Sequence, residues 1–197
     1  MKQVFIDTSH KYLTIACIDK DEILSFYHEY AFKNQSEIVM SILSDLVSKA
    51  KWEPQDIDRI VITKGPGSYT GVRIAMTIAK TLSAVSDVQI ATVTSLECYV
   101  NTDKKTFVML DARSDRVYGG YFIDKKYVEG PRVYTLDEVR AFVRDEDPNM
   151  VGDLTLIGRE DIFSIDQDRI IEIITQAVSI DDVDHLKPMY LKEMSAY

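Results

Sequence analysis

The feature that most constrains this chain is a loop with three glycines that joins a strand-like run to a helical pattern. The loop follows the apolar run of residues 58–63 and precedes a helical pattern that extends to about residue 84. Its singled-out residues are Gly65, Pro66, Gly67, Ser68, Tyr69, Thr70, Gly71 and Arg73. Glycine permits positive φ angles and close backbone approach, and proline fixes one φ angle in the turn. This order indicates an α/β protein with the loop at the edge of a sheet.

The glycine loop allows two interpretations, a turn that caps a helix or a site that contacts a ligand or partner. Ser68 and Thr70 are both candidate N-caps, and backbone amides at a helix N-terminus can bind anions. The loop does not match the Walker A sequence, because no lysine follows its last glycine. It also lacks the Gly-x-Gly-x-x-Gly order of dinucleotide-binding loops. From the residues alone, both interpretations stay open.

Composition restricts the classes of function. The chain has 197 residues, 46% of them hydrophobic, which is ordinary for a globular protein of one domain or two small lobes. Its net charge of -9 argues against strong direct binding of nucleic acid, since proteins that bind RNA alone usually present a basic face. We therefore expect any functional link to RNA to pass through a protein partner.

Location and redox chemistry follow from a few residues. No apolar run is long enough for a transmembrane helix, and Asp7 interrupts the apolar start where a signal peptide would continue. Cys17 and Cys98 form neither a disulfide framework nor zinc-ligand spacing, and Cys17 lies in an apolar strand pattern typical of a buried free thiol. We expect a cytoplasmic protein.

The periodicity of apolar residues predicts a repeated order of elements. In the first half we expect strands at 4–9, 12–18, 23–31, 57–63 and 89–93, a polar turn at 19–22, and helices at 36–50 and from the glycine loop to 84. In the second half we expect strands at 106–110, 117–123, 126–128 and 154–157, helices at 136–143 and 170–178, and loops at 130–131 and 145–149. An RNase-H-like lobe has, in chain order, a meander of three strands, then a helix, a strand, a second helix and a further strand. We predict two such lobes, residues 1–100 and 101–197, with mixed sheets flanked by helices.

The second predicted helix has an unusual row of small residues. Gly71, Ala75 and Ala79 are four apart and share one helix face, which lets another element approach closely. An adjacent apolar ridge consists of Ile74, Ile78 and Leu82. Packing against the chain's own sheet and contact with another subunit are both open at this stage.

The glycine loop and the helix after it, residues 65–80, resemble the signature of the bacterial TsaB (YeaZ) family. The chain also has weaker matches, in the same order as in the family, at residues 5–9, 93–97, 110–118 and 187–192. The resemblance implies a glycoprotease-like member of the superfamily of actin-like ATPases (ASKHA), heat-shock chaperones and sugar kinases.

The resemblance also implies a function in tRNA threonylcarbamoyladenosine (t6A) modification. A family member of this kind is a non-catalytic scaffold or activating subunit that binds its catalytic paralogue TsaD, works with the ATPase TsaE, and forms a homodimer when alone. It meets tRNA only through the complex and has no membrane partner. The resemblance places the interface on the two helices of the first lobe, at Ile38, Ile42, Gly71, Ala75, Ile78, Ala79 and Leu82.

The residues expected at a nucleotide site look incomplete. Asp7 ends the first strand, where related phosphoryl-transfer enzymes place an acid, but the glycine expected two residues later is absent. Asp111 opens the second lobe without a glycine-rich hairpin, and the three histidines are scattered. We therefore expect no catalytic residue, no metal and no cofactor of its own, with ATP or ADP bound only at the level of the complex. The alternatives are a stand-alone nucleotide hydrolase or kinase of the same fold, or a glycoprotease-like peptidase.

Overall fold

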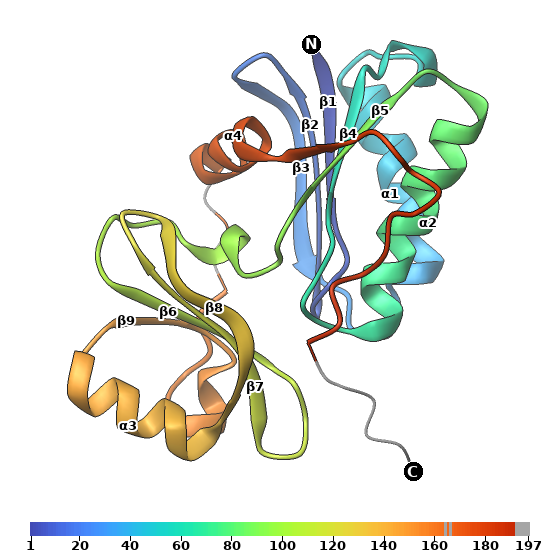
Figure 1. Ribbon diagram of the computed structural model, residues 1–197. Coiled ribbons are helices and arrows are strands. Elements are labelled where there is room, and N and C mark those ends of the chain that lie inside the picture. Colours follow the sequence, from blue (N-terminus) through green and yellow to red (C-terminus); the bar gives the residue numbers. More distant parts are fainter. Residues whose placement is uncertain (164, 166, 192–197) are drawn as a thin grey trace. The chain divides into compact units, whose positions relative to one another are not determined.

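The computed structural model describes residues 1–163, 165 and 167–191 and is a mixed α/β protein with two sheets (Figure 1). The strands are β1 (Lys2–Asp7), β2 (Tyr12–Asp19), β3 (Glu22–Tyr30), β4 (Arg59–Thr63), β5 (Gln89–Val93), β6 (Thr106–Asp111), β7 (Arg116–Ile123), β8 (Lys126–Thr135), β9 (Asn149–Gly152) and β10 (Val178–Ile180). The α-helices are α1 (Gln35–Lys49), α2 (Tyr69–Val85), α3 (Leu136–Glu146) and α4 (Gln167–Gln176). Short 3₁₀ helices are η1 (Pro54–Asp56), η2 (Glu97–Tyr99) and η3 (Leu154–Ile157).

The chain divides into two compact units. The first unit comprises Met1–Ser95 and Gln167–Pro188, and the second comprises the described residues of 96–166 and 189–197. The sequence predicted two lobes that meet at residue 100. In the structure, residues 167–188 belong to the first unit instead of the second.

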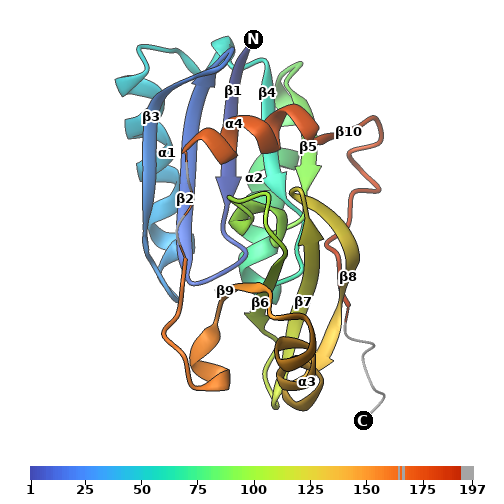
Figure 2. The same ribbon diagram turned by 90° about the vertical axis from the view of Figure 1, so that its left-hand side faces the viewer.

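The first unit has a sheet of strand order β10-β5-β4-β1-β2-β3. Strands β1, β2 and β3 form an antiparallel meander, including the predicted turn between Asp19 and Glu22, and β4 and β5 continue in parallel with β1. Helices α1 and α2 cover one face of this sheet, and α4 crosses the other (Figure 2). Because side chains alternate along a strand, Val4 and Ile6 join the core beneath α1 and α2, while Asp7 belongs to the opposite face.

The second unit repeats the first part of this order. Its sheet has the order β8-β7-β6-β9, with an antiparallel meander β6-β7-β8 and with β9 parallel to β6. A core that includes Phe107, Met109, Tyr134 and Val139 joins this sheet to α3.

Two predicted elements of the second half are wrong, and two strands were not predicted: β9 begins at the end of the predicted loop 145–149, and β10 begins at the end of the predicted helix 170–178. Residues 154–157 form η3 instead of a strand, since a short apolar run has no periodicity that separates the two. The predicted loop at Gly130 and Pro131 lies inside β8, which runs to Thr135 instead of ending at residue 128. Proline is tolerated there because β8 is an edge strand with an irregular register.

Helix α4 is held in the first unit by a buried arginine of β4. The guanidinium of Arg59 donates to the carbonyl oxygens of Ile174 at 3.1 Å and Ala177 at 2.9 Å, and to Oε1 of Gln3 at 3.2 Å. A cation is favourable at the C-terminal end of a helix, where carbonyl groups lack helical partners. Burial lowers the pKa of Arg59. Strand β10 then pairs with the edge of β5.

Candidate functional site

The glycine loop, which follows β4, is packed between the segments that follow β1 and β5, the two strands on either side of β4. The amide of Ser95 donates to the carbonyl of Gly65 at 2.9 Å, and the amide of Ser68 donates to the carbonyl of Ser9 at 2.7 Å. A Cβ atom at Gly67 would lie 2.3 Å from that same carbonyl oxygen of Ser9. Glycine is required there because the loop backbone lies directly against the chain after β1.

Helix α2 begins with a conventional serine cap. The hydroxyl oxygen of Ser68 accepts a hydrogen bond from the amide of Gly71 at 3.2 Å. Of the two candidate caps, Ser68 therefore satisfies one of the free amides of the first turn, and Thr70 is exposed.

The row of small residues on α2 faces the interior of the first unit. Gly71 is buried, and Ala75 and Ala79 are completely buried within the same core as β1 and β4. A Cβ atom at Gly71 would lie 2.0 Å from the carbonyl oxygen of Thr8. The small residues thus allow α2 to lie close to the end of β1, the intramolecular alternative that the sequence had left open.

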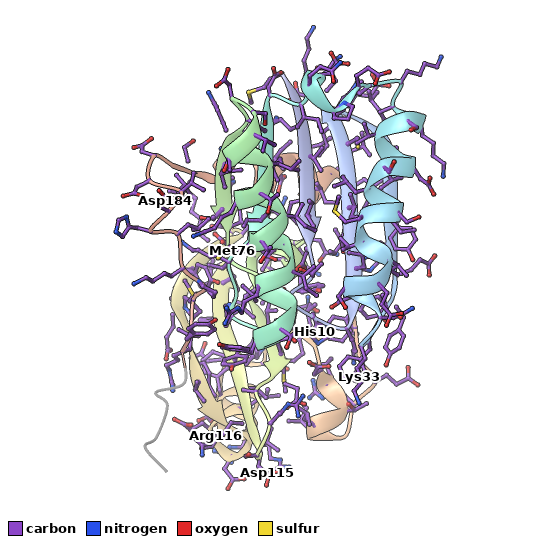
Figure 3. All side chains as sticks on the ribbon, turned by 90° about the vertical axis from the view of Figure 1, so that its right-hand side faces the viewer. His10, Lys33, Met76, Asp115, Arg116 and Asp184 are labelled. Carbon is purple, nitrogen blue, oxygen red and sulfur yellow. The ribbon has the colours of Figure 1, made fainter. Side chains whose placement is uncertain are left out.

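An apolar groove lies between α1 and α2, which run side by side on the face shown in Figure 3. It has a volume of about 430 Å³. Its lining residues are Ser36, Val39, Met40, Tyr69, Thr70, Arg73, Ile74, Thr77 and Ile78. Met40 and Tyr69 are large apolar side chains that are 52% and 58% exposed. The groove therefore presents apolar surface at a point where two helices could accept side chains from another molecule.

Arg73 is the charged member of the groove lining. Its Nη1 donates to the hydroxyl oxygen of Tyr69 at 2.6 Å, and its guanidinium lies 5.2 Å from the centre of the tyrosine ring. The two residues are one helical turn apart, so they form a polar rim beside the apolar wall of Ile74 and Ile78.

The structure separates the predicted interface residues into two groups. Ile78 lines the groove, and Ile38, Ile42 and Leu82 are half-buried against the core, whereas Gly71, Ala75 and Ala79 are inside it. Sequence reasoning missed Met40 and Thr77. Both lie outside the apolar stripes, and only the lateral packing of two helices makes them part of one groove.

Asp7 is completely buried at the end of β1. Its Oδ1 accepts hydrogen bonds from the hydroxyl of Thr63 at 2.7 Å and from the amide of Ser9 at 2.8 Å. Its Oδ2 has no hydrogen-bond partner among the described residues. These contacts give Asp7 a structural role in joining β1 to β4.

Asp111 occupies the matching position in the second unit. It is exposed, its Oδ1 accepts from the amide of Arg113 at 2.6 Å, and its own amide donates to Oδ2 of Asp153 at 2.7 Å. In the described part of the chain, no three His, Cys, Asp or Glu side chains are grouped so as to hold a metal ion. Nor does any helix within it have the length and apolarity needed to span a membrane.

The sequence comparisons agree on one group of proteins. A family model described as TsaD, tRNA N6-adenosine threonylcarbamoyltransferase, matches residues 26–150. The tRNA threonylcarbamoyladenosine biosynthesis protein TsaB of Bacillus subtilis is 40% identical over 121 residues, which cover 59% of this chain and 53% of the relative. The protein of the same name from Escherichia coli is 24% identical over 124 residues, covering 60% and 53%. The chain spans about half the length of the curated relatives it matches.

Solved structures share the fold over nearly the whole chain. YeaZ from Pseudomonas aeruginosa has a TM-score of 0.77 at 18% identity and covers 96% of this chain and 100% of that one. A crystal structure of an uncharacterized protein with similarity to peptidase YEAZ, from the same organism, has a TM-score of 0.79 at 16% identity and covers 97% and 99%. The chain therefore shares the fold of these two structures, and the predicted mixed α/β fold with two sheets flanked by helices is confirmed.

Proposed function

This chain belongs to the TsaB/YeaZ family, and we propose that it is a non-catalytic subunit of a bacterial t6A modification complex. In this proposal it binds a TsaD-like catalytic paralogue and holds that paralogue in an active geometry. The names of the curated relatives support the assignment to t6A biosynthesis.

The observation that carries the proposal is the apolar groove between α1 and α2. Exposed Met40 and Tyr69 lie beside Ile74 and Ile78, so docking of a second helical surface would remove this apolar area from water. We propose that the groove is the contact surface for the TsaD-like paralogue, and that a second copy of the chain occupies it when the paralogue is absent.

The remaining partners belong to the same proposal. A TsaE-like ATPase acts on the pair, and ATP or ADP is bound at the level of the complex. The chain meets tRNA through the complex, which agrees with its net charge of -9. We place the assembly in the cytoplasm.

One observation favours a second candidate, a nucleotide hydrolase or kinase that acts alone. Asp7 is a buried carboxylate with one unpartnered oxygen at the carboxyl edge of parallel strands, a common place for ligand sites in α/β proteins. Against this candidate, two backbone groups of the neighbouring loop already have partners: the Ser68 amide bonds to Ser9, and the Gly71 amide bonds to Ser68.

The test is reconstitution with the TsaD-like paralogue, with Met40→Asp as the altered chain and Ser41→Asp as its matched control. Ser41 is exposed on the same helix but does not line the groove. Burying an unpaired carboxylate should weaken binding by about a hundredfold or more, with a parallel loss of t6A formation. The control should bind like the wild type.

Two results would contradict the proposal. If Met40→Asp binds the paralogue as tightly as Ser41→Asp and the wild type do, the groove is not the contact surface. Saturable ATP turnover by the isolated chain, abolished by Asp7→Asn, would favour the stand-alone enzyme.

A further inference from the structure

The hydroxyl of Thr8 is bonded to the backbone of α2 from outside the helix. Thr8 follows β1 and is completely buried. Its Oγ1 donates to the carbonyl oxygen of Gly71 at 2.6 Å and accepts from the amide of Ala75 at 3.2 Å. A threonine hydroxyl can donate once and accept twice, so both contacts are made with ordinary hydrogen-bonding capacity.

The two backbone groups contacted by Thr8 are themselves a helical pair. In an α-helix the amide of residue i bonds to the carbonyl of residue i−4, which for Ala75 is Gly71. The hydroxyl of Thr8 therefore bonds to both the acceptor and the donor of one helical hydrogen-bond position in α2. This contact holds the first turns of α2 at one point beside the end of β1.

The backbone around Thr8 is held on both sides. The preceding residue, Asp7, bonds to Thr63 and Ser9, and the carbonyl of Ser9 accepts the amide of Ser68. A Cβ atom added at Gly71 would lie only 2.0 Å from the carbonyl oxygen of Thr8, so the backbones of the two residues are in close contact. Thr8 is thus a fixed point against which α2 is placed.

The groove is built from the same turns of α2. Tyr69 and Arg73 lie two residues either side of Gly71, and Ile74 precedes Ala75. We propose that Thr8 is a positioning residue for the groove: its hydroxyl sets where Tyr69, Arg73 and Ile74 stand relative to α1. This inference rests on the proposed function of the groove as the contact surface for the paralogue.

The test compares removal of the hydroxyl with its retention. Thr8→Val removes the hydroxyl while keeping the branched shape, and Thr8→Ser keeps the hydroxyl. In Thr8→Val, Gly71 and Ala75 can close their own helical bond, so no buried polar group is left unpaired and the chain should fold. If Thr8→Val does not fold, Thr8→Ala removes the same hydroxyl and takes its place in both measurements.

Two measurements read the result. Affinity for the TsaD-like paralogue should fall about tenfold with Thr8→Val, comparable to the loss of one hydrogen bond, and change by less than about threefold with Thr8→Ser. Hydrogen exchange of amides in residues 69–77 should become about tenfold faster in Thr8→Val, with exchange in β1 and β4 unchanged.

The outcomes separate this inference from the proposed function. Wild-type affinity and wild-type exchange in Thr8→Val would overturn the positioning role. Equal losses in Thr8→Val and Thr8→Ser, with faster exchange throughout the first unit, would also overturn it, because they indicate a general structural role. If the wild-type chain does not bind the paralogue, the proposed function fails, while the exchange experiment still decides whether Thr8 positions α2.

Discussion

In both units of this protein, a three-stranded meander is followed by a helix and by a strand parallel to the first. The order is β1-β2-β3-α1-β4 in the first unit and β6-β7-β8-α3-β9 in the second. The first strand ends in an aspartate in each case, and Oδ1 of Asp7 or Asp111 accepts the amide two residues later, from Ser9 at 2.8 Å or Arg113 at 2.6 Å. The same local turn therefore occurs twice.

The units differ in the elements that come after the parallel strand. In the first unit, β4 leads into the glycine loop and α2, and Asp7 is buried and bonded to Thr63. In the second unit, β9 leads to η3, and Asp111 stays exposed. The comparison teaches that an aspartate turn is a local property, whereas its burial depends on the elements added after the repeated core.

The largest expected effect concerns close backbone contact in the first unit. Gly71→Ala places a Cβ atom against the backbone of Thr8 and should lower the free energy of unfolding by about 3 kcal/mol. Gly158→Ala in the second unit meets no atom within 4 Å and should cost about 1 kcal/mol, because φ is +78° there.

Each unit contains one buried cysteine that can report its unfolding. Cys17 belongs to the first unit and Cys98 to the second, and burial raises the pKa of Cys17, which suppresses the reactive thiolate. In Gly71→Ala, Cys17 should be labelled at a lower denaturant concentration than in wild type, with Cys98 unchanged. Equal shifts at both cysteines would show that the two units unfold together.

The next effect tests the assignment of α4 to the first unit. Arg59→Met removes the bonds to Ile174 and Ala177 and should lower stability by about 2 kcal/mol, with faster proteolysis in residues 167–188. Arg140→Met removes an exposed pair with Asp137 and should cost less than about 0.5 kcal/mol. Unchanged proteolysis in Arg59→Met would contradict the role of Arg59 in holding α4.

A smaller effect separates the two matching aspartates. Asp7→Asn keeps an oxygen that can accept from Thr63 and Ser9, so stability should fall by about 1 kcal/mol, and Asp111→Asn should change it by less than about 0.5 kcal/mol. Modification by the reconstituted complex should stay close to wild type for both. A loss of about a hundredfold with Asp7→Asn in an assembled complex would mean that the first unit takes part in chemistry.

The smallest effect is a pH dependence at the start of α3. The amide and hydroxyl of Thr135, and then Arg132, hold the pKa of Glu138 below its ordinary value of 4.5. A lowered carboxyl pKa stabilises the folded state above about pH 4.5, and this contribution disappears as pH falls through the folded-state value. Because Glu138 is exposed, the change should be about 0.5 kcal/mol or less.

Urea unfolding of wild type and Glu138→Gln between pH 3 and pH 6, roughly the range of carboxyl titration, measures this contribution. The difference in stability between the two proteins should be larger at the upper end of the range. Glu160→Gln, which changes an exposed carboxyl outside the cap, is the control. A difference that stays constant with pH would exclude the cap as its source.

Local sequence determined most of the elements of this protein. Strands β1 to β5, helices α1 and α2 and the repeated meander can all be predicted, because each depends on residues within a few positions of one another. For the cap of α2 the sequence offered both Ser68 and Thr70, and the structure selects Ser68. The glycine loop also identified the family, since its spacing is specific. The run at residues 187–192, also part of the resemblance, lies in part outside the described residues.

The way these elements combine depends on contacts between residues that are far apart in the chain. The hydroxyl of Thr8 meets Gly71 across 63 residues of sequence, and Arg59 meets Ile174 across 115. No local pattern encodes such pairings, because a small residue suits a helix facing its own sheet as well as one facing a partner. The sequence therefore determined which helices are amphipathic, and packing determined that Ala75 is internal while Met40 and Tyr69 remain exposed at the groove.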